Sequence, residues 1–189
     1  MIRAASAVAF AGCLVGCPAE RREAIAPSAP IAAVRECNPH SVILVRHAEK
    51  AAADPQERDP SLSPKGHDRA ARLMKLLGNA SITRLVASEY KRTQQTLAPL
   101  ADRVGKPVET RSAAHSSDLV HELQDAPPGS TTVVATHSNV IPQLVRELGG
   151  GPLSRLDEAG NLPETEFGRV LVLSVGCASA ATLVELNSD

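Results

Sequence analysis

The sequence has very few aromatic residues: it contains no tryptophan, one tyrosine and two phenylalanines among 189 residues. A hydrophobic core must therefore be built from leucine, valine, isoleucine and alanine. The sequence also has no run of lysine and arginine, and its formal net charge is −1. This charge balance argues against a nucleic-acid partner, which would call for a basic surface.

Apolar residues dominate the first seventeen positions, which have the layout of an export signal. Arg3 precedes an apolar stretch, residues 4–15, that is too short to remain in a bilayer as a spanning helix. The stretch leads to Cys17 and resembles a bacterial lipoprotein signal, in which the cysteine is lipidated and becomes the mature N-terminus. We therefore expect residues 1–17 to be a lipoprotein signal peptide. An ordinary secretory signal is the alternative, and Cys13 gives a weaker second match.

The next segment, residues 18–36, is rich in alanine, proline, glutamate and arginine, which favours a flexible tether. Residues 37–189 then have the size of one domain. They contain no second apolar segment long enough for a membrane helix, so we expect membrane contact only through the N-terminal lipid. The expected location is the periplasmic side of the bacterial envelope. Pro18, where an aspartate would indicate the inner membrane, favours the outer one.

Strand and helix patterns alternate along residues 37–189. Short apolar runs predict strands at 41–45, 84–87, 108–110 and 131–136. Apolar positions at helical spacing predict helices at 64–77, 90–104, 118–123 and 140–148. The last two strands, at 169–175 and 182–186, read as a hairpin. This order predicts a three-layer α/β sandwich: a mostly parallel sheet, helices on both faces and a C-terminal β-hairpin.

Three of these strands lead directly into residues that can hold a phosphate. The first is followed by Arg46 and His47, the second by Ser88 and Arg92, and the third by His137. In an open α/β sheet, ligands bind outside the carboxyl ends of the strands, so these side chains are expected to meet in one pocket. Two histidines and two arginines suit a dianionic phosphoryl group and a histidine nucleophile.

These segments resemble, in order and approximate spacing, the motifs of the histidine phosphatase superfamily, the phosphoglycerate-mutase-like group. The matching segments are residues 45–49 with 62–66, residues 88–96, and residues 136–139. Any one of them is a weak pattern, but the ordered set is specific. The resemblance covers essentially the whole domain.

The resemblance implies a role for each matching residue. His47 would be the nucleophile and form a phosphohistidine that water then hydrolyses. Arg46 and Arg92 would clamp the phosphoryl oxygens, and His137 would add a further hydrogen-bond donor. The implied activity is a metal-independent phosphatase acting on a small phosphorylated substrate, with no cofactor, because the arginines supply the positive charge.

The carboxylic acid that many superfamily members use to protonate the leaving oxygen has no clear counterpart. Ser138 follows the second histidine, where one branch has an aspartate. Another branch uses a glutamate between the arginine segment and the second histidine, an interval that contains Asp118 and Glu122. Glu49, close to the nucleophile, is a third candidate. An activated leaving group, such as that of a phosphoramidate, would need the acid less.

Other functions compete with an exported phosphatase of phosphomonoesters or phosphoramidates. A phosphoglycerate-type mutase is one alternative, although export from the cytosol argues against it. A catalytically idle phosphate-binding lipoprotein is another. A metal site has little support, since the sequence lacks His-x-His and His-Glu-x-x-His. Sugar phosphates, nucleotides, phosphorylated envelope lipids and phosphohistidine all remain open as substrates.

Cys37 and Cys177 would be the only thiols left after signal removal and acylation of Cys17. Export would place them in an oxidising compartment. In the superfamily fold, the strand at 169–175 neighbours the first strand and is antiparallel to it, so the two cysteines should lie at the same edge of the sheet. The resemblance therefore implies a disulfide between them. Two unrelated buried cysteines are the alternative.

Overall fold

The computed structural model describes residues 39–51, 56–176 and 180–188. Within these ranges six strands and four helices follow one another along the chain. They are β1 (His40–Arg46), α1 (Pro64–Leu77), β2 (Arg84–Ser88), α2 (Lys91–Val104), β3 (Val108–Arg111), α3 (Ser116–Gln124), β4 (Thr131–Thr136), α4 (Ile141–Glu147), β5 (Arg169–Val175) and β6 (Thr182–Asn187). None of the helices in this part of the chain is long and apolar enough to cross a membrane.

All six strands form one sheet in the order β3-β2-β4-β1-β5-β6. The first four strands of this order are parallel, whereas β5 pairs antiparallel with β1 and β6 pairs antiparallel with β5. The predicted mostly parallel sheet with a C-terminal hairpin is therefore confirmed. Every predicted element is present, with its ends displaced by at most two residues.

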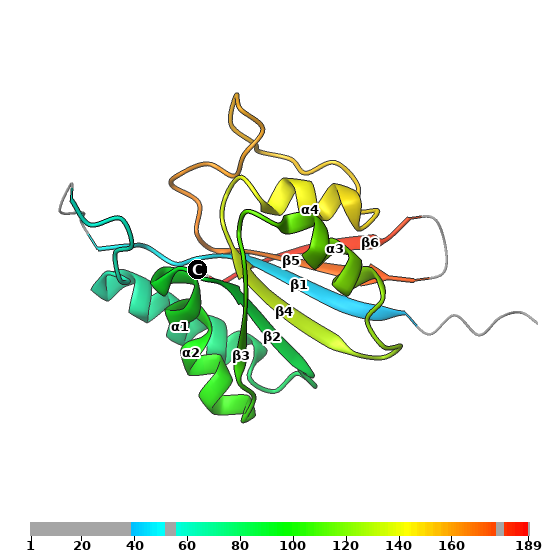
Figure 1. Ribbon diagram of the computed structural model, residues 1–189, viewed down its shortest axis with the longest axis horizontal. Coiled ribbons are helices and arrows are strands. Elements are labelled where there is room, and N and C mark those ends of the chain that lie inside the picture. The colour runs from blue at the N-terminus through cyan, green and yellow to red at the C-terminus, as the bar shows by residue number, and fades with distance from the viewer. Residues whose placement is uncertain (1–38, 52–55, 177–179, 189) are drawn as a thin grey trace, which may run out of the picture. The chain divides into compact units, whose positions relative to one another are not determined.

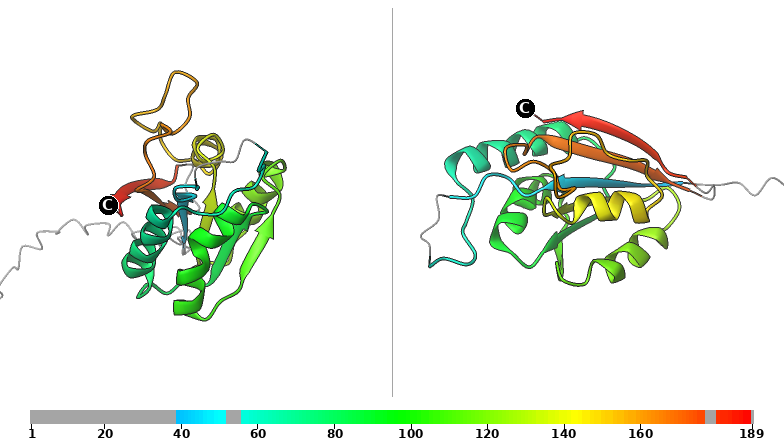
Figure 2. Two further views of the ribbon diagram at one scale, coloured as in Figure 1. Left: turned by 90° about the vertical axis from the view of Figure 1, so that its left-hand side faces the viewer. Right: turned by 90° about the horizontal axis from the view of Figure 1, so that it is seen from above.

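Two helices cover each face of the sheet: α1 and α2 lie on one side, α3 and α4 on the other (Figure 1; Figure 2). Strand β1 is buried on both sides, because successive side chains of a strand point to opposite faces. Ile43 and Val45 pack toward α1 and α2, whereas Val42 and Leu44 pack toward α3 and α4. The buried hydrophobic residues are all leucine, valine, isoleucine and alanine, which confirms the expected aliphatic core.

Helix α1 fixes the loop that follows β1. Ser63 caps the helix, accepting a hydrogen bond from the backbone of Gly66 at 3.1 Å, and Pro64 occupies the first turn as its fixed φ favours. The backbone N–H of Ser63 in turn donates to the carbonyl of Glu49 at 2.8 Å. Gly66 faces that same carbonyl so closely that a Cβ there would collide with it. Glycine therefore permits the close approach between α1 and the loop.

The predicted disulfide and the predicted lipidation site, Cys17, lie outside the described residues. The strand pairing on which the disulfide prediction relied is confirmed, because β1 and β5 are antiparallel neighbours with His40 opposite Val175. The bridge between Cys37 and Cys177 itself stays a prediction.

We predict that Gly66→Ala destabilises the protein by roughly 1–3 kcal/mol, because the added methyl group must push two backbone segments apart. The sign is diagnostic, since alanine in a helix is otherwise about 1 kcal/mol more favourable than glycine. Urea denaturation measures the change. Gly151→Ala is the matched control, because no described atom lies within 4 Å of its new Cβ. A Gly66→Ala protein as stable as the wild type would contradict the close approach.

Candidate active site

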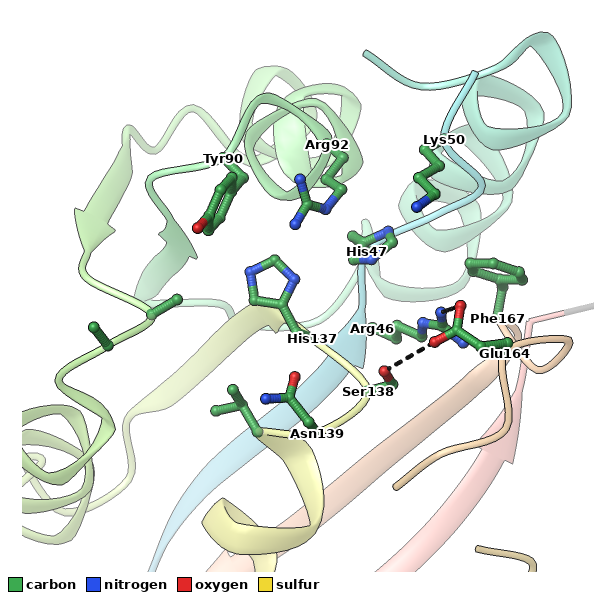
Figure 3. Close-up of a pocket in the computed structure, with 13 residues that line it drawn as sticks. Arg46, His47, Lys50, Tyr90, Arg92, His137, Ser138, Asn139, Glu164 and Phe167 are labelled. Atoms are coloured by element: carbon green, nitrogen blue, oxygen red, sulfur yellow. Dashed lines mark hydrogen bonds and ion pairs between the residues drawn. The ribbon is translucent and has the colours of Figure 1, made fainter. Parts of the chain in front are cut away.

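The carboxyl ends of β1, β2 and β4 lie side by side and open onto a cavity of about 470 Å³. The four residues predicted to meet there, Arg46, His47, Arg92 and His137, all line it. Figure 3 shows them converging from separate elements. Side chains that the sequence did not single out also line the cavity: Lys50, Tyr90, Asn139, Glu164 and Phe167.

His47 is held in one tautomer by its own loop. Its backbone N–H donates to the carbonyl of Thr136 at 2.8 Å, which continues the β1–β4 pairing by one step. Its ring Nδ1 lies 2.8 Å from the carbonyl of Ala48. A carbonyl only accepts hydrogen bonds, so Nδ1 carries the proton. The neutral ring therefore keeps its free lone pair on Nε2.

The surroundings of His47 favour the neutral ring. Burial, joined by the charges of Arg46 and Arg92 and opposed by the hydrogen bond to Ala48, lowers its pKa from 6.5 to about 4. At neutral pH the ring is therefore uncharged. A histidine nucleophile needs this combination of a neutral ring and a fixed orientation.

His137 stands across the pocket, with its ring centroid 5.4 Å from that of His47. Its Nε2 lies 3.0 Å from the hydroxyl of Ser88, at the end of β2. Burial together with the charge of Arg92 lowers the pKa of His137 to about 4. Both imidazoles are thus neutral in the pocket as it stands.

Arg92 presents a largely uncommitted cation to the cavity. It is the second residue of α2, and its guanidinium carbon lies 4.3 Å from the centre of the Tyr90 ring. Its closest carboxylate among the described residues is that of Asp59, an ion-pair contact at 3.6 Å. Tyr90 also meets His137 edge-on, with ring centroids 5.1 Å apart. The only tyrosine of the chain therefore orients both an arginine and a histidine of the site.

Arg46 was expected to leave its guanidinium free to clamp a phosphoryl group, but most of that group is already hydrogen-bonded to protein. Its Nη1 donates to the carbonyls of Pro163 at 2.8 Å and Glu166 at 3.3 Å, and its Nη2 donates to the carboxylate of Glu164 at 2.8 Å. Its guanidinium also stacks on Phe167 at 4.2 Å. The fork thus holds the loop before β5. Nε of Arg46 is buried and has no hydrogen-bond partner among the described residues.

The loop between α4 and β5, residues 148–168, was expected only to connect elements, yet it supplies Glu164 and Phe167 to the site. Figure 3 shows both next to Arg46. An aromatic residue just before a strand is informative in a chain with two phenylalanines. Because the core is aliphatic, a phenylalanine at this position is not needed for core packing. The scarcity of aromatic residues was therefore the one signal that could have pointed to Phe167 as a site residue.

The structure brings none of the three candidate acids into the pocket. Glu49 accepts hydrogen bonds from Nε and Nη2 of Arg69, both at 2.9 Å. Burial tends to raise the pKa of Glu49, but Arg69 outweighs it and lowers this pKa to about 2. Asp118 lies in the first turn of α3 and does not line the cavity. Glu49 and Asp118 are therefore not placed to protonate a leaving group there.

Glu122 lies near the opposite, amino ends of the strands, in a separate cavity. It accepts hydrogen bonds from Arg111 at 2.9 Å and Arg84 at 2.6 Å, which lower its pKa to about 2. Among the described residues, Glu164 is the only carboxylate that lines the active-site cavity. Burial acts to raise its pKa, but Arg46 prevails and lowers it, so this carboxylate is ionised.

A metal centre gains no support from the residues that the structure describes. Across residues 39–51, 56–176 and 180–188, no three histidine, cysteine, aspartate or glutamate side chains gather closely enough to hold a metal ion. The cavity instead collects the cations Arg46, Lys50 and Arg92. This charge suits an anionic ligand.

A family comparison agrees with the site. Residues 42–115 match the sequence model of the histidine phosphatase superfamily (branch 1). The match includes Arg46, His47 and Arg92 and ends before His137. A comparison with curated proteins gives no match.

Solved structures with the same fold include two phosphatases. One is the protein histidine phosphatase SixA in complex with tungstate: it is 20% identical, with a TM-score of 0.63, and the alignment covers 78% of this chain and 97% of that one. The other is a mycobacterial glucosyl-3-phosphoglycerate phosphatase with inorganic phosphate: it is 19% identical, with a TM-score of 0.57, covering 78% and 95%. At these identities the likeness concerns the fold. Together with the family match, it confirms the predicted resemblance to the histidine phosphatase superfamily.

The two neutral histidines predict a pH-dependent stability. Because the folded pKa values, about 4, lie below the unfolded value of 6.5, the unfolded chain binds more protons in between. Stability is then complete above pH 6.5 and is lost as the pH falls toward 4. We expect a loss of about 2 kcal/mol per ring between about pH 7 and about pH 5. Urea denaturation at several pH values measures it.

The double variant His47→Gln/His137→Gln should flatten this dependence. His67→Gln, which alters an exposed histidine of α1, is the control and should leave it unchanged. An unaltered pH dependence in the double variant would show that the two rings do not cause it.

Proposed function

We propose that this protein is a phosphatase that hydrolyses a phosphomonoester or a phosphoramidate through a phosphohistidine on His47. One observation carries the proposal: the ring of His47 is neutral, with its proton fixed on Nδ1, inside a cavity that gathers positive charge. A free imidazole lone pair facing an anion-binding pocket is what nucleophilic attack on phosphorus needs.

In the proposed reaction, Nε2 of His47 forms a bond to phosphorus while the bond from phosphorus to the leaving group breaks. Water then attacks the phosphohistidine, the nitrogen–phosphorus bond breaks, and inorganic phosphate departs. Arg92, Arg46 and His137 would hold the phosphoryl oxygens. Such preorganised donors usually provide the largest share of catalysis.

The ionised state of Glu164 limits which leaving groups the proposed reaction can release. A carboxylate held by Arg46 cannot donate a proton at neutral pH, and it is the only carboxylate lining the cavity among the described residues. The proposed substrates are therefore those whose leaving group departs without a strong enzymatic acid. A phosphoramidate, whose nitrogen can be protonated beforehand, meets this condition, as does an ester of an acidic alcohol. SixA, one of the solved structures with this fold, is a protein histidine phosphatase.

Glu164 also favours a phosphatase over the phosphoglycerate-type mutase. It puts a negative charge at the rim of the cavity, next to Arg46 and Ser138. A phosphoglycerate would bring its own carboxylate to that rim, and like charges there oppose binding. A neutral or cationic leaving group meets no such repulsion.

We further propose that the protein works as a lipoprotein on the periplasmic side of the envelope, tethered through residues 18–36. The signal-like residues 1–17 support this proposal.

We predict that the wild type partitions with membranes and that Cys17→Ser yields a precursor without the acyl group. Membrane fractionation and mass spectrometry of the N-terminus make the measurement. A soluble, acyl-free mature protein would contradict lipidation.

We predict that His47→Ala abolishes phosphate release and that Arg92→Ala lowers kcat by roughly 10²–10³-fold, the usual cost of removing one charge-stabilising donor. A panel of phosphoramidates and phosphomonoesters, assayed for free phosphate, measures both effects. His67→Ala and Lys91→Ala are matched controls, because both side chains are exposed and neither lines the cavity. Full activity in His47→Ala would refute the mechanism.

The same assay separates the remaining alternatives. Alkaline quenching should trap phosphate on the wild type, and acid should release it. Saturable phosphate binding without any turnover would instead indicate an idle binding protein.

Activity should survive EDTA, because the proposed charge comes from arginine and histidine. Loss on chelation that a divalent cation restores would contradict metal independence.

A further inference from the structure

A buried chain of hydroxyl groups runs from His137 away from the cavity. Nε2 of His137 lies 3.0 Å from the Ser88 hydroxyl, which lies 2.8 Å from the Thr93 hydroxyl. Ser88 is 5% exposed and Thr93 is fully buried. Neither hydroxyl lines the cavity, so neither is positioned to touch a ligand. Their effect on the site must pass through the imidazole.

The protons of this chain can be assigned one by one. Thr93 Oγ1 lies 2.7 Å from the carbonyl oxygen of Tyr90. Two oxygens this close need a proton between them, and a carbonyl has none to give, so the Thr93 hydroxyl donates there. The Ser88 hydroxyl must then donate to Thr93. The Ser88 hydroxyl then has no proton left for His137. The hydrogen bond between them therefore requires that Nε2 of His137 carries the proton and donates it to Ser88.

The other nitrogen of the ring faces the cavity. In Figure 3, Nδ1 of His137 lies on the side of the ring toward His47 and Arg46, whereas Nε2 lies on the far side. With the proton on Nε2, a neutral His137 presents a lone pair at Nδ1. A lone pair repels a phosphoryl oxygen and cannot donate a hydrogen bond to it. Only the doubly protonated ring can serve as the donor that the proposed function requires.

We propose that Ser88 and Thr93 are positioning residues that hold neutral His137 as the Nε2–H tautomer, so that each bound anion brings one proton onto Nδ1. The tautomer follows from the contacts alone, and its role in phosphoryl binding rests on the proposed function. The two histidines of the site are thereby held in opposite tautomers. His47 carries its proton on Nδ1 and keeps Nε2 free, and His137 does the reverse.

The charges around His137 are consistent with the ring taking up a proton when an anion binds. Burial disfavours the charged ring most, and Arg92 and Arg46 add to this effect, whereas Glu89 favours the charged ring. The rings of neutral His47 and of Tyr90 also face it. A bound dianion would offset the two arginines and raise the pKa of His137. Binding then weakens as the pH rises, by about tenfold in Kd for each pH unit between the free and bound pKa values.

Nitrogen NMR of the full chain with ¹⁵N-labelled histidine tests the tautomer directly at neutral pH. The signals of His137 are assigned by comparison with His137→Gln. We expect a protonated Nε2 and a bare Nδ1, and the reverse would overturn the proposal. Thr93→Val frees the Ser88 hydroxyl to donate to Nε2 and should shift the proton toward Nδ1, whereas Thr93→Ser should restore the wild-type pattern. An unchanged tautomer in a folded Thr93→Val protein would also overturn it.

Calorimetry with sulfate tests the coupled proton. Sulfate stays a dianion at every pH used, so any proton taken up must land on the protein. Titrations in buffers of different protonation enthalpy should give about one proton per bound sulfate, and His137→Gln should lose that uptake. No uptake in the wild type, or an undiminished uptake in His137→Gln, would contradict the proposal. If sulfate does not bind, the proposed function fails, while the NMR measurement still decides the tautomer.

Discussion

The parallel pairing of β1 with β4 is the constraint on which the site depends. Their register runs from Ser41 opposite Thr131 to Arg46 opposite Thr136, and the backbone bond from His47 to Thr136 extends it by one step. This pairing sets His47 and His137 side by side at the end of the sheet. A slip of one residue would turn every side chain of the strand to the other face and separate the two rings. The aliphatic packing on both faces of β1 fixes that register.

The scarcity of aromatic rings and the chemistry of the site are related. The core packs without them, and two of the three rings in the sequence lie in the cavity, each against an arginine. Tyr90 steadies Arg92, which stays open to the cavity, whereas Phe167 backs Arg46, whose fork is occupied by the loop before β5. The two arginines thus differ in function although both line one pocket. Arg92 faces the cavity with one carboxylate, Asp59, at 3.6 Å, and Arg46 ties a loop to the strand of the proposed nucleophile.

The sequence predicted well those features that depend on local pattern. Apolar runs and caps located the strands and helices, and the segments that follow three strands located Arg46, His47, Arg92 and His137. The carboxylates were harder, because their roles depend on partners distant in sequence. Glu49 is engaged by Arg69 and Glu122 by Arg84, which no spacing rule indicates. Glu164 stands on an irregular loop with no periodicity, so only the folded contact with Arg46 brings it to the site.

Proton placement unites the remaining features of the site. The only carboxylate that lines the cavity among the described residues is held ionised by Arg46, and both imidazoles are neutral when the pocket is empty. Neither this carboxylate nor either imidazole therefore offers an acidic proton at neutral pH while the cavity is empty. A proton needed by the leaving group must arrive with the substrate, either on the leaving atom or on His137 as the anion binds. In the proposed reaction, the burial that keeps the imidazoles neutral thus restricts which leaving groups can depart.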